Sequence, residues 1–218
     1  MTDVIRLEDV DKDGAVREAA AKVGEGDSRA EFFRKTAMGG TALLGGGVLL
    51  AGFPELALGG KPSKKQDVNI LNFALTLEYL ESTFYKESLA NANLQGEVLR
   101  AAKIVTRHEG AHVRFLKRAL GKARDPRPQF EFGDATSNQT NFLATAVILE
   151  DTGVTAYSGQ APRIKQKKVV QAAVSILTVE ARHAAYLREL NNQTFAPRTF
   201  DKPATKRQVL SKAKAFIK

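Results

Sequence analysis

Four glutamates and two histidines occupy positions where a buried helix normally carries leucine or alanine. They are Glu78, Glu109, His112, Glu150, Glu180 and His183. Each stands inside a stripe of apolar residues that recur three and four positions apart, the spacing of one helix face. Burying four carboxylates without partners would be costly, and their like charges would repel. Two divalent cations would neutralise the four charges, and the imidazoles would add neutral nitrogen ligands.

These residues form two copies of one pattern. Moving the first helical segment by 72 positions and the next by 71 aligns the polar pairs Glu78 with Glu150, Tyr85 with Tyr157, Glu109 with Glu180, and His112 with His183. A glutamate and a histidine three positions apart lie on one face of a helix, so both can bind the same ion. The repeat predicts two similar hairpins about a pseudo-twofold axis, with a site for two iron or manganese ions between them.

Helical periodicity extends over most of the second part of the chain, and no strand pattern of useful length is present. We expect helices from Asp67 onward, over about 97–120, from about 141 to Gly159 and Pro162, over about 166–192, and a short basic one over 205–217. Short connections make the first two and the next two antiparallel hairpins. The link between the hairpins has about eighteen residues of about 3.3 Å each, enough to span a helix of about 36 Å. The sequence therefore predicts an all-α four-helix bundle with one long crossover.

The spacing of these motifs resembles that of the ferritin-like superfamily. The resemblance covers about residues 67–192. It rests on Glu78-x6-Tyr85, Glu109-x2-His112, Glu150-x6-Tyr157 and Glu180-x2-His183. Within the superfamily, the chain looks most similar to a branch of exported ferritin-like proteins that includes the desiccation-related proteins. The resemblance implies that Glu109 and Glu180 bridge two iron or manganese ions. It also implies that the remaining four residues are terminal ligands, one carboxylate and one nitrogen for each ion.

Three further residues are candidates for an accessory role. Glu81 lies in the buried arc one turn from Glu78, but its repeat partner is Gly153, so we expect an accessory carboxylate or an iron-entry residue. Tyr85 and Tyr157 stand two turns beyond the terminal glutamates. They either donate hydrogen bonds to ligands of the opposite hairpin or serve mainly in packing.

Two other interpretations of the buried residues compete with a di-metal site. Residues 108–112 spell HExxH, the motif of zinc proteases in which both histidines bind zinc. The repeat argues against this interpretation, because the counterpart of His108 is Val179, which cannot bind a metal. His108 is then expected to flank the site. The other interpretation is a hydrogen-bonded polar network that has lost its metal.

The composition narrows the kinds of site that are available. The chain has 218 residues, 43% hydrophobic and 26% charged, with no cysteine, which fits one globular domain with or without a tail. Disulfide scaffolds, zinc fingers, thiolate iron-sulfur centres and cysteine nucleophiles are therefore excluded. Any metal must bind to oxygen and nitrogen.

The first 60 residues differ in amino-acid composition from the rest of the chain. Thr36 to Gly60 is rich in Gly, Ala and Leu, and it follows Ser28-Arg29-Ala30-Glu31-Phe32, which is similar to a twin-arginine export signal with Ala30 in place of the second arginine. A helical hairpin or membrane anchor is the alternative. We therefore expect an N-terminal extension with a signal over 1–60, the bundle over 61–195, a basic C-terminal tail or short helix over 196–218, and export to the periplasm or cell envelope.

The charge is also unevenly distributed. Residues 1–60 contain 7 Lys and Arg against 10 Asp and Glu, whereas residues 61–218 contain 26 against 14. This second part would attract an anionic envelope polymer or lipid headgroups, although a solvated basic face without a partner is the alternative. Nucleic acid is not an expected partner of an exported chain.

These features favour one function and leave a second open. Two bridged metal ions can exchange two electrons with dioxygen or hydrogen peroxide, which predicts iron oxidation or peroxide removal in stress protection, by a ferroxidase or a catalase-like oxidoreductase. The alternative is a metal-stabilised structural or binding protein of the cell envelope without redox turnover. A second apolar stripe, Phe73, Leu77, Leu80 and Phe84, faces either the crossover or another copy in a homo-oligomer.

Overall fold

The computed structural model describes residues 65–218, which fold into five α-helices and no β-strand. Four long helices form the bundle, α6 (Lys65–Asn91), α7 (Gly96–Leu120), α8 (Gln139–Gln160) and α9 (Lys167–Leu190), and a short helix follows, α10 (Lys206–Ala213). The expected N-terminal extension and export signal over 1–60 lie outside the described residues. Within 65–218, no helix has both the length and the apolar composition to cross a membrane. The predicted all-α bundle is confirmed.

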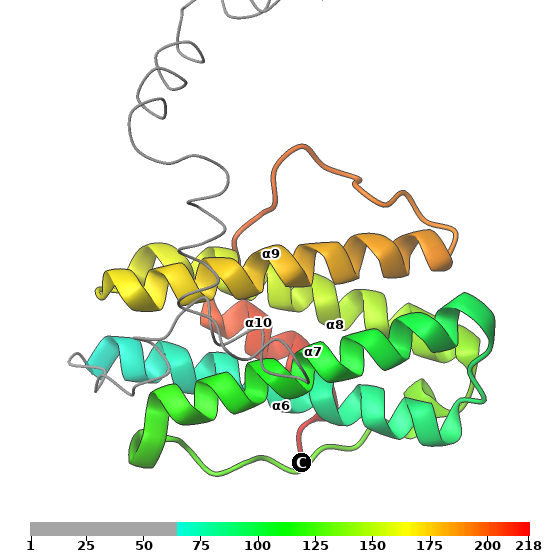
Figure 1. Cartoon of the computed structure of the whole chain (residues 1–218), viewed down its shortest axis with the longest axis horizontal. Coiled ribbons are helices and arrows are strands. Elements are labelled where there is room, and N and C mark those ends of the chain that lie inside the picture. Colours follow the sequence, from blue (N-terminus) through cyan, green and yellow to red (C-terminus); the bar gives the residue numbers. More distant parts are fainter. Residues whose placement is uncertain (1–64) are drawn as a thin grey trace, which may run out of the picture. The chain divides into compact units, whose positions relative to one another are not determined.

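The long helices pair as two hairpins, α6 with α7 and α8 with α9 (Figure 1). Asp67, in the first turn of α6, joins the two hairpins at one end of the bundle. Its buried carboxylate accepts hydrogen bonds from the backbone N–H groups of Lys165 and Gln166 at 2.9 and 3.0 Å. These donors lie just before α9, where a helix start leaves N–H groups unpaired. A side chain of the first hairpin therefore fixes where the second helix of the other hairpin begins.

The crossover between α7 and α8 runs along the length of α6. Near the start of α6, the Asn72 side chain donates to Ala123 O and accepts from Asp125 N. Near its end, Glu87 accepts a hydrogen bond from Thr136 Oγ1. The link therefore travels from one end of the bundle to the other, which makes α7 and α8 run in the same direction. This is the predicted crossover.

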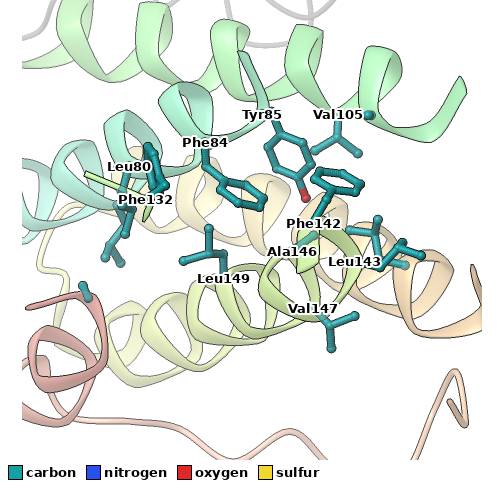
Figure 2. Close-up of a cluster of buried hydrophobic side chains, with 14 of the residues drawn as sticks. Leu80, Phe84, Tyr85, Val105, Phe132, Phe142, Leu143, Ala146, Val147 and Leu149 are labelled. Carbon is teal, nitrogen blue, oxygen red and sulfur yellow. The ribbon is translucent and has the colours of Figure 1, made fainter. Parts of the chain in front are cut away.

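The second apolar stripe of α6 is covered by the chain itself. Phe84 contacts Phe132 of the crossover at 5.4 Å between ring centroids and stacks on Phe142 of α8 at 5.6 Å. Figure 2 shows Phe84 among Phe132, Tyr85 and Leu149. Val209 of α10 belongs to the same cluster and is 1% exposed. Of the two expected environments for this stripe, the structure shows the crossover, with α10 beside it.

The C-terminal segment is part of the bundle's packing. Helix α10 packs on α8 and α6, and beyond it Phe130 of the crossover pairs with Ile217 in an isolated antiparallel bridge. The Glu131 N–H donates to Phe216 O at 3.0 Å. The helix expected over 205–217 is shorter than predicted, because residues 214–216 tighten into a 3-10 turn that leads into this bridge.

The third helix ends between Gly159 and Pro162, the two residues expected to end it, because α8 runs to Gln160. Gly159 also has a packing role. A Cβ at this position would lie 2.0 Å from the Ala204 carbonyl oxygen, and the Ala204 N–H donates to Thr155 O at 2.9 Å. The segment before α10 therefore passes against the helix backbone, where only glycine leaves room.

Candidate metal centre

The structure brings all six predicted residues together at the centre of the bundle. They come from α6, α7, α8 and α9, and every one is buried. They form two groups of four in which one ligand atom from each residue lies within 4.8 Å of the others, and these groups are Glu78, Glu109, His112 and Glu180, and Glu109, Glu150, Glu180 and His183. Glu109 and Glu180 belong to both groups, so each has a position between two adjacent cation sites.

Nδ1 of each histidine lies close to more carboxylates than it can donate a hydrogen bond to. His112 Nδ1 lies 3.1 Å from Glu78 Oε2, 3.1 Å from Glu109 Oε2 and 3.2 Å from Glu180 Oε1. His183 Nδ1 lies 3.1 Å from Glu150 Oε2 and 3.3 Å from Glu109 Oε1. A ring nitrogen carries at most one proton and can donate it to one acceptor at a time. The carboxylate oxygens around each nitrogen therefore lie close enough together to serve as ligands of a metal ion.

Three carboxylate oxygens in the middle of the cluster form no hydrogen bond of suitable geometry, although two of them lie 3.2 and 3.3 Å from a histidine nitrogen. They are Glu109 Oε1, Glu180 Oε1 and Glu180 Oε2, and all three are fully buried. Buried polar atoms in native proteins almost always have a partner, and charged ones most of all. The unpaired atoms belong to the two glutamates shared by both groups. The residues present therefore fit the binding of metal ions through oxygen and nitrogen donors.

The pKa values of the cluster residues reflect an excess of buried negative charge. Burial raises the pKa of Glu78 to about 7, although His112 opposes the shift. Burial and the charge of Glu109 raise the pKa of Glu180 well above its usual value. Burial lowers the pKa of His183, but the close carboxylates of Glu109 and Glu150 outweigh this effect and bring the pKa to about 10. Without metal, protons must therefore supply the charge that cations would provide.

Two tyrosines fix the terminal carboxylates from the opposite hairpin. Tyr85 OH of α6 donates to Glu150 Oε1 of α8 at 2.5 Å, and Tyr157 OH of α8 donates to Glu78 Oε1 of α6 at 2.6 Å. Each carboxylate then keeps its second oxygen toward a histidine. Of the two roles expected for these tyrosines, the structure shows the hydrogen bonds to the opposite hairpin.

The family comparison agrees with this geometry. A family model described as a ferritin-like domain matches residues 66–193. The chain belongs to this ferritin-like family. No curated protein matches the chain in sequence. The matched range contains all six residues of the cluster, so in this ferritin-like domain the buried Glu and His groups have the composition and closeness to hold metal ions.

His108 lies beside the cluster of the ferritin-like domain and outside both groups. Its Nδ1 lies 2.8 Å from His183 Nε2, on the side of the ring that faces away from the carboxylates. A bond at Nε2 fixes which nitrogen of His183 carries the proton and leaves Nδ1 free for a metal. His108 and His112 do not converge on a common point in either group, so the zinc-protease arrangement is not found within residues 65–218. The sequence predicted only that His108 flanks the site.

Glu81 adds a fifth carboxylate to the surroundings of the ferritin-like site. It is 2% exposed, and burial and the charge of Glu180 raise its pKa well above the usual value. It belongs to neither group of four. The opposite helix makes room for it, since a Cβ at Gly153 would lie 2.9 Å from Glu180 Oε2 and 3.2 Å from Glu81 Oε1. Gly153, the repeat counterpart of Glu81, therefore leaves the space that the Glu81 side chain occupies.

We expect Gly153→Ala to destabilise the protein and weaken metal binding, whereas Gly110→Ala stabilises it. The added methyl at 153 meets carboxylate oxygens, and such overpacking costs about 1–3 kcal/mol. At 110, also inside a helix, the methyl meets only the end of the Arg114 side chain at 3.4 Å, so the helix gains about 0.5–1 kcal/mol. Thermal unfolding and metal content measure both effects. Equal stability of the two variants would show that the space at Gly153 is not needed.

Proposed function

We propose that this ferritin-like protein binds two iron or manganese ions and uses them to react with dioxygen or hydrogen peroxide, in iron oxidation or peroxide removal. The observation that carries the proposal is that Glu109 and Glu180 belong to both groups of four ligands. The two shared carboxylates would hold both ions. Such a pair, when bound, supplies two electrons in concert to one diatomic or peroxide molecule.

The chain's own residues hold the site in one geometry. Tyr85 and Tyr157 each fix one oxygen of a terminal glutamate across the hairpin interface. His108 fixes the orientation of the His183 ring. Complete burial of Glu78, Glu109, Glu150 and Glu180 excludes bulk water and strengthens every charge interaction inside the cluster. These features suit a preorganised reaction centre better than a surface site for ion storage.

The cellular setting is part of the proposal. The basic, glycine-rich pattern of residues 28–60 supports export to the periplasm or cell envelope, and the similarity to desiccation-related proteins supports a role in oxidative or desiccation stress. The alternative function is a metal-stabilised structural protein of the envelope, supported by the excess of 26 Lys and Arg over 14 Asp and Glu in residues 61–218.

Turnover separates the two functions. We expect the metal-loaded protein to consume peroxide, or to oxidise ferrous iron with uptake of dioxygen, at least tenfold faster than Glu180→Gln, because that variant loses a shared ligand. Glu189→Gln on the exposed face of α9 is the matched control and should keep the full rate. Stopped-flow absorbance and an oxygen electrode measure the rates. Equal rates in wild type and Glu180→Gln would favour the structural function.

A further inference from the structure

A cavity opens at the end of the bundle where α6 begins and α8 ends. Its outer part, of about 430 Å³, is lined by polar and basic residues, and its inner part, of about 20 Å³, lies among apolar side chains of all four long helices. Ile70 and Gln160 line both parts. The cavity therefore consists of two spaces that adjoin at these residues, a polar mouth and a narrow apolar interior.

The mouth carries an excess of positive charge. Lys65, Arg163 and Lys206 line it, and no acidic side chain within residues 65–218 does so. None of these three cations forms an ion pair with a described carboxylate within 4.0 Å. Lys206 Nζ lies 5.4 Å from the ring centroid of Phe73, which lines the inner part. A cation at the boundary between the two parts favours an anion whose apolar portion points inward.

The inner part is unsuited to water. Its exposed surface is apolar, and Ile164, Ala173, Ile176 and Tyr157 are among the residues that line it. A buried water needs two to four polar partners, and the Tyr157 hydroxyl is already bonded to Glu78. A space of about 20 Å³ accepts only a slender group, such as the end of an aliphatic chain.

One polar group remains unpaired between the mouth and the interior. Gln160 is 6% exposed, and its buried side-chain Nε2 has no hydrogen-bond partner. Leaving a buried donor unpaired costs about 1–3 kcal/mol. A turn of the Gln160 side chain toward the mouth would bring this donor to an acceptor oxygen whose charge lies toward Lys65, Arg163 and Lys206.

We infer that this cavity is a binding site for a small aliphatic carboxylate. The carboxylate lies among the three cations and accepts a hydrogen bond from Gln160, and the hydrocarbon chain enters the apolar interior. An inorganic anion would leave the interior empty, and an uncharged alcohol would leave the cations without a partner. The site is formed by residues outside the metal cluster, so its occupancy does not depend on the proposed redox function.

Calorimetry on the purified full-length chain tests this site with a series of matched ligands. Hexanoate is expected to bind at one site per chain and at least tenfold more tightly than acetate, because each methylene buried in an apolar space contributes about threefold to fourfold in affinity. Hexanol lacks the charge and inorganic phosphate lacks the chain. Each should therefore bind at least tenfold more weakly than hexanoate. Equal binding of hexanoate and acetate, or of hexanoate and hexanol, would overturn the proposal.

Two variants in the cavity and one control outside it locate the ligand. Lys206→Gln should weaken hexanoate about tenfold, whereas Lys212→Gln, also exposed on α10, should leave the affinity unchanged. Ala173→Leu fills the interior and should remove the advantage of hexanoate over acetate. If Ala173→Leu fails to fold, the ligand series and the two lysine variants still test whether the cavity binds a carboxylate. No saturable binding of hexanoate, or equal effects of the two lysine variants, would show that the cavity is not a carboxylate site.

Discussion

Glu180→Gln is expected to lose both metal ions, whereas Glu78→Gln is expected to lose only one. Glu180 belongs to both groups of ligands, and Glu78 belongs to one. Glutamine keeps the shape of the side chain but removes the negative charge that a bridging ligand must share between two cations. Metal analysis should therefore find close to two ions per chain in the wild type, about one in Glu78→Gln, and almost none in Glu180→Gln.

The pseudo-twofold repeat provides internal controls for this experiment. Glu150→Gln should behave like Glu78→Gln, and Glu109→Gln like Glu180→Gln, because the members of each pair have equivalent positions. Glu189→Gln, exposed on the same helix as Glu180, should keep both ions. One zinc ion per chain that survives Glu150→Gln and is lost in His108→Ala would instead support a zinc site in the HExxH motif.

The fold and the six residues of the buried cluster were predictable because they depend on periodicity. A glutamate inside an apolar stripe violates the rule that governs buried helix faces, and the violation recurs in both halves of the chain. Six residues with that property could be found without knowing how the helices pack. The length of the link over 121–138 then restricted the topology to a bundle with a crossover, as the contacts of Asn72 and Glu87 show.

The details that sequence analysis missed depend on contacts between segments with no common period. The sequence predicts that Gly159 and Pro162 end the helix, but it does not show that the small size of Gly159 is needed where the Ala204 backbone crosses α8. The bond between His108 and His183 joins residues 75 positions apart and has no counterpart in the other hairpin, where Val179 stands. The repeat drew attention to His108 as an exception, but only packing shows which atom it contacts.

Metal-free and metal-loaded protein are expected to respond to pH in opposite directions. In the metal-free protein, Glu78 has a folded-state pKa of about 7, above the ordinary value of 4.5. The protonated form is favoured in the folded state, so the stabilisation is complete below pH 4.5 and is lost as the pH rises to 7. His183 contributes in the same direction from pH 6.5 to about 10. Thermal unfolding with a chelator should therefore show a melting temperature that falls steadily between pH 5 and 9.

The metal-loaded protein should instead become more stable over the same range. Metal ions bind the deprotonated carboxylates and the neutral imidazoles, so protons compete with them at low pH. Binding stabilises the folded state by mass action, and this contribution grows as the competing protons leave. Glu81→Gln is the informative control, because burial and the charge of Glu180 raise the pKa of Glu81 as well. In the metal-free protein, this variant should make the melting temperature fall less steeply with pH. In the metal-loaded protein, it should keep both ions. Parallel pH curves with and without metal would show that the buried carboxylates titrate independently of metal binding, which a ligand cluster of this geometry does not permit.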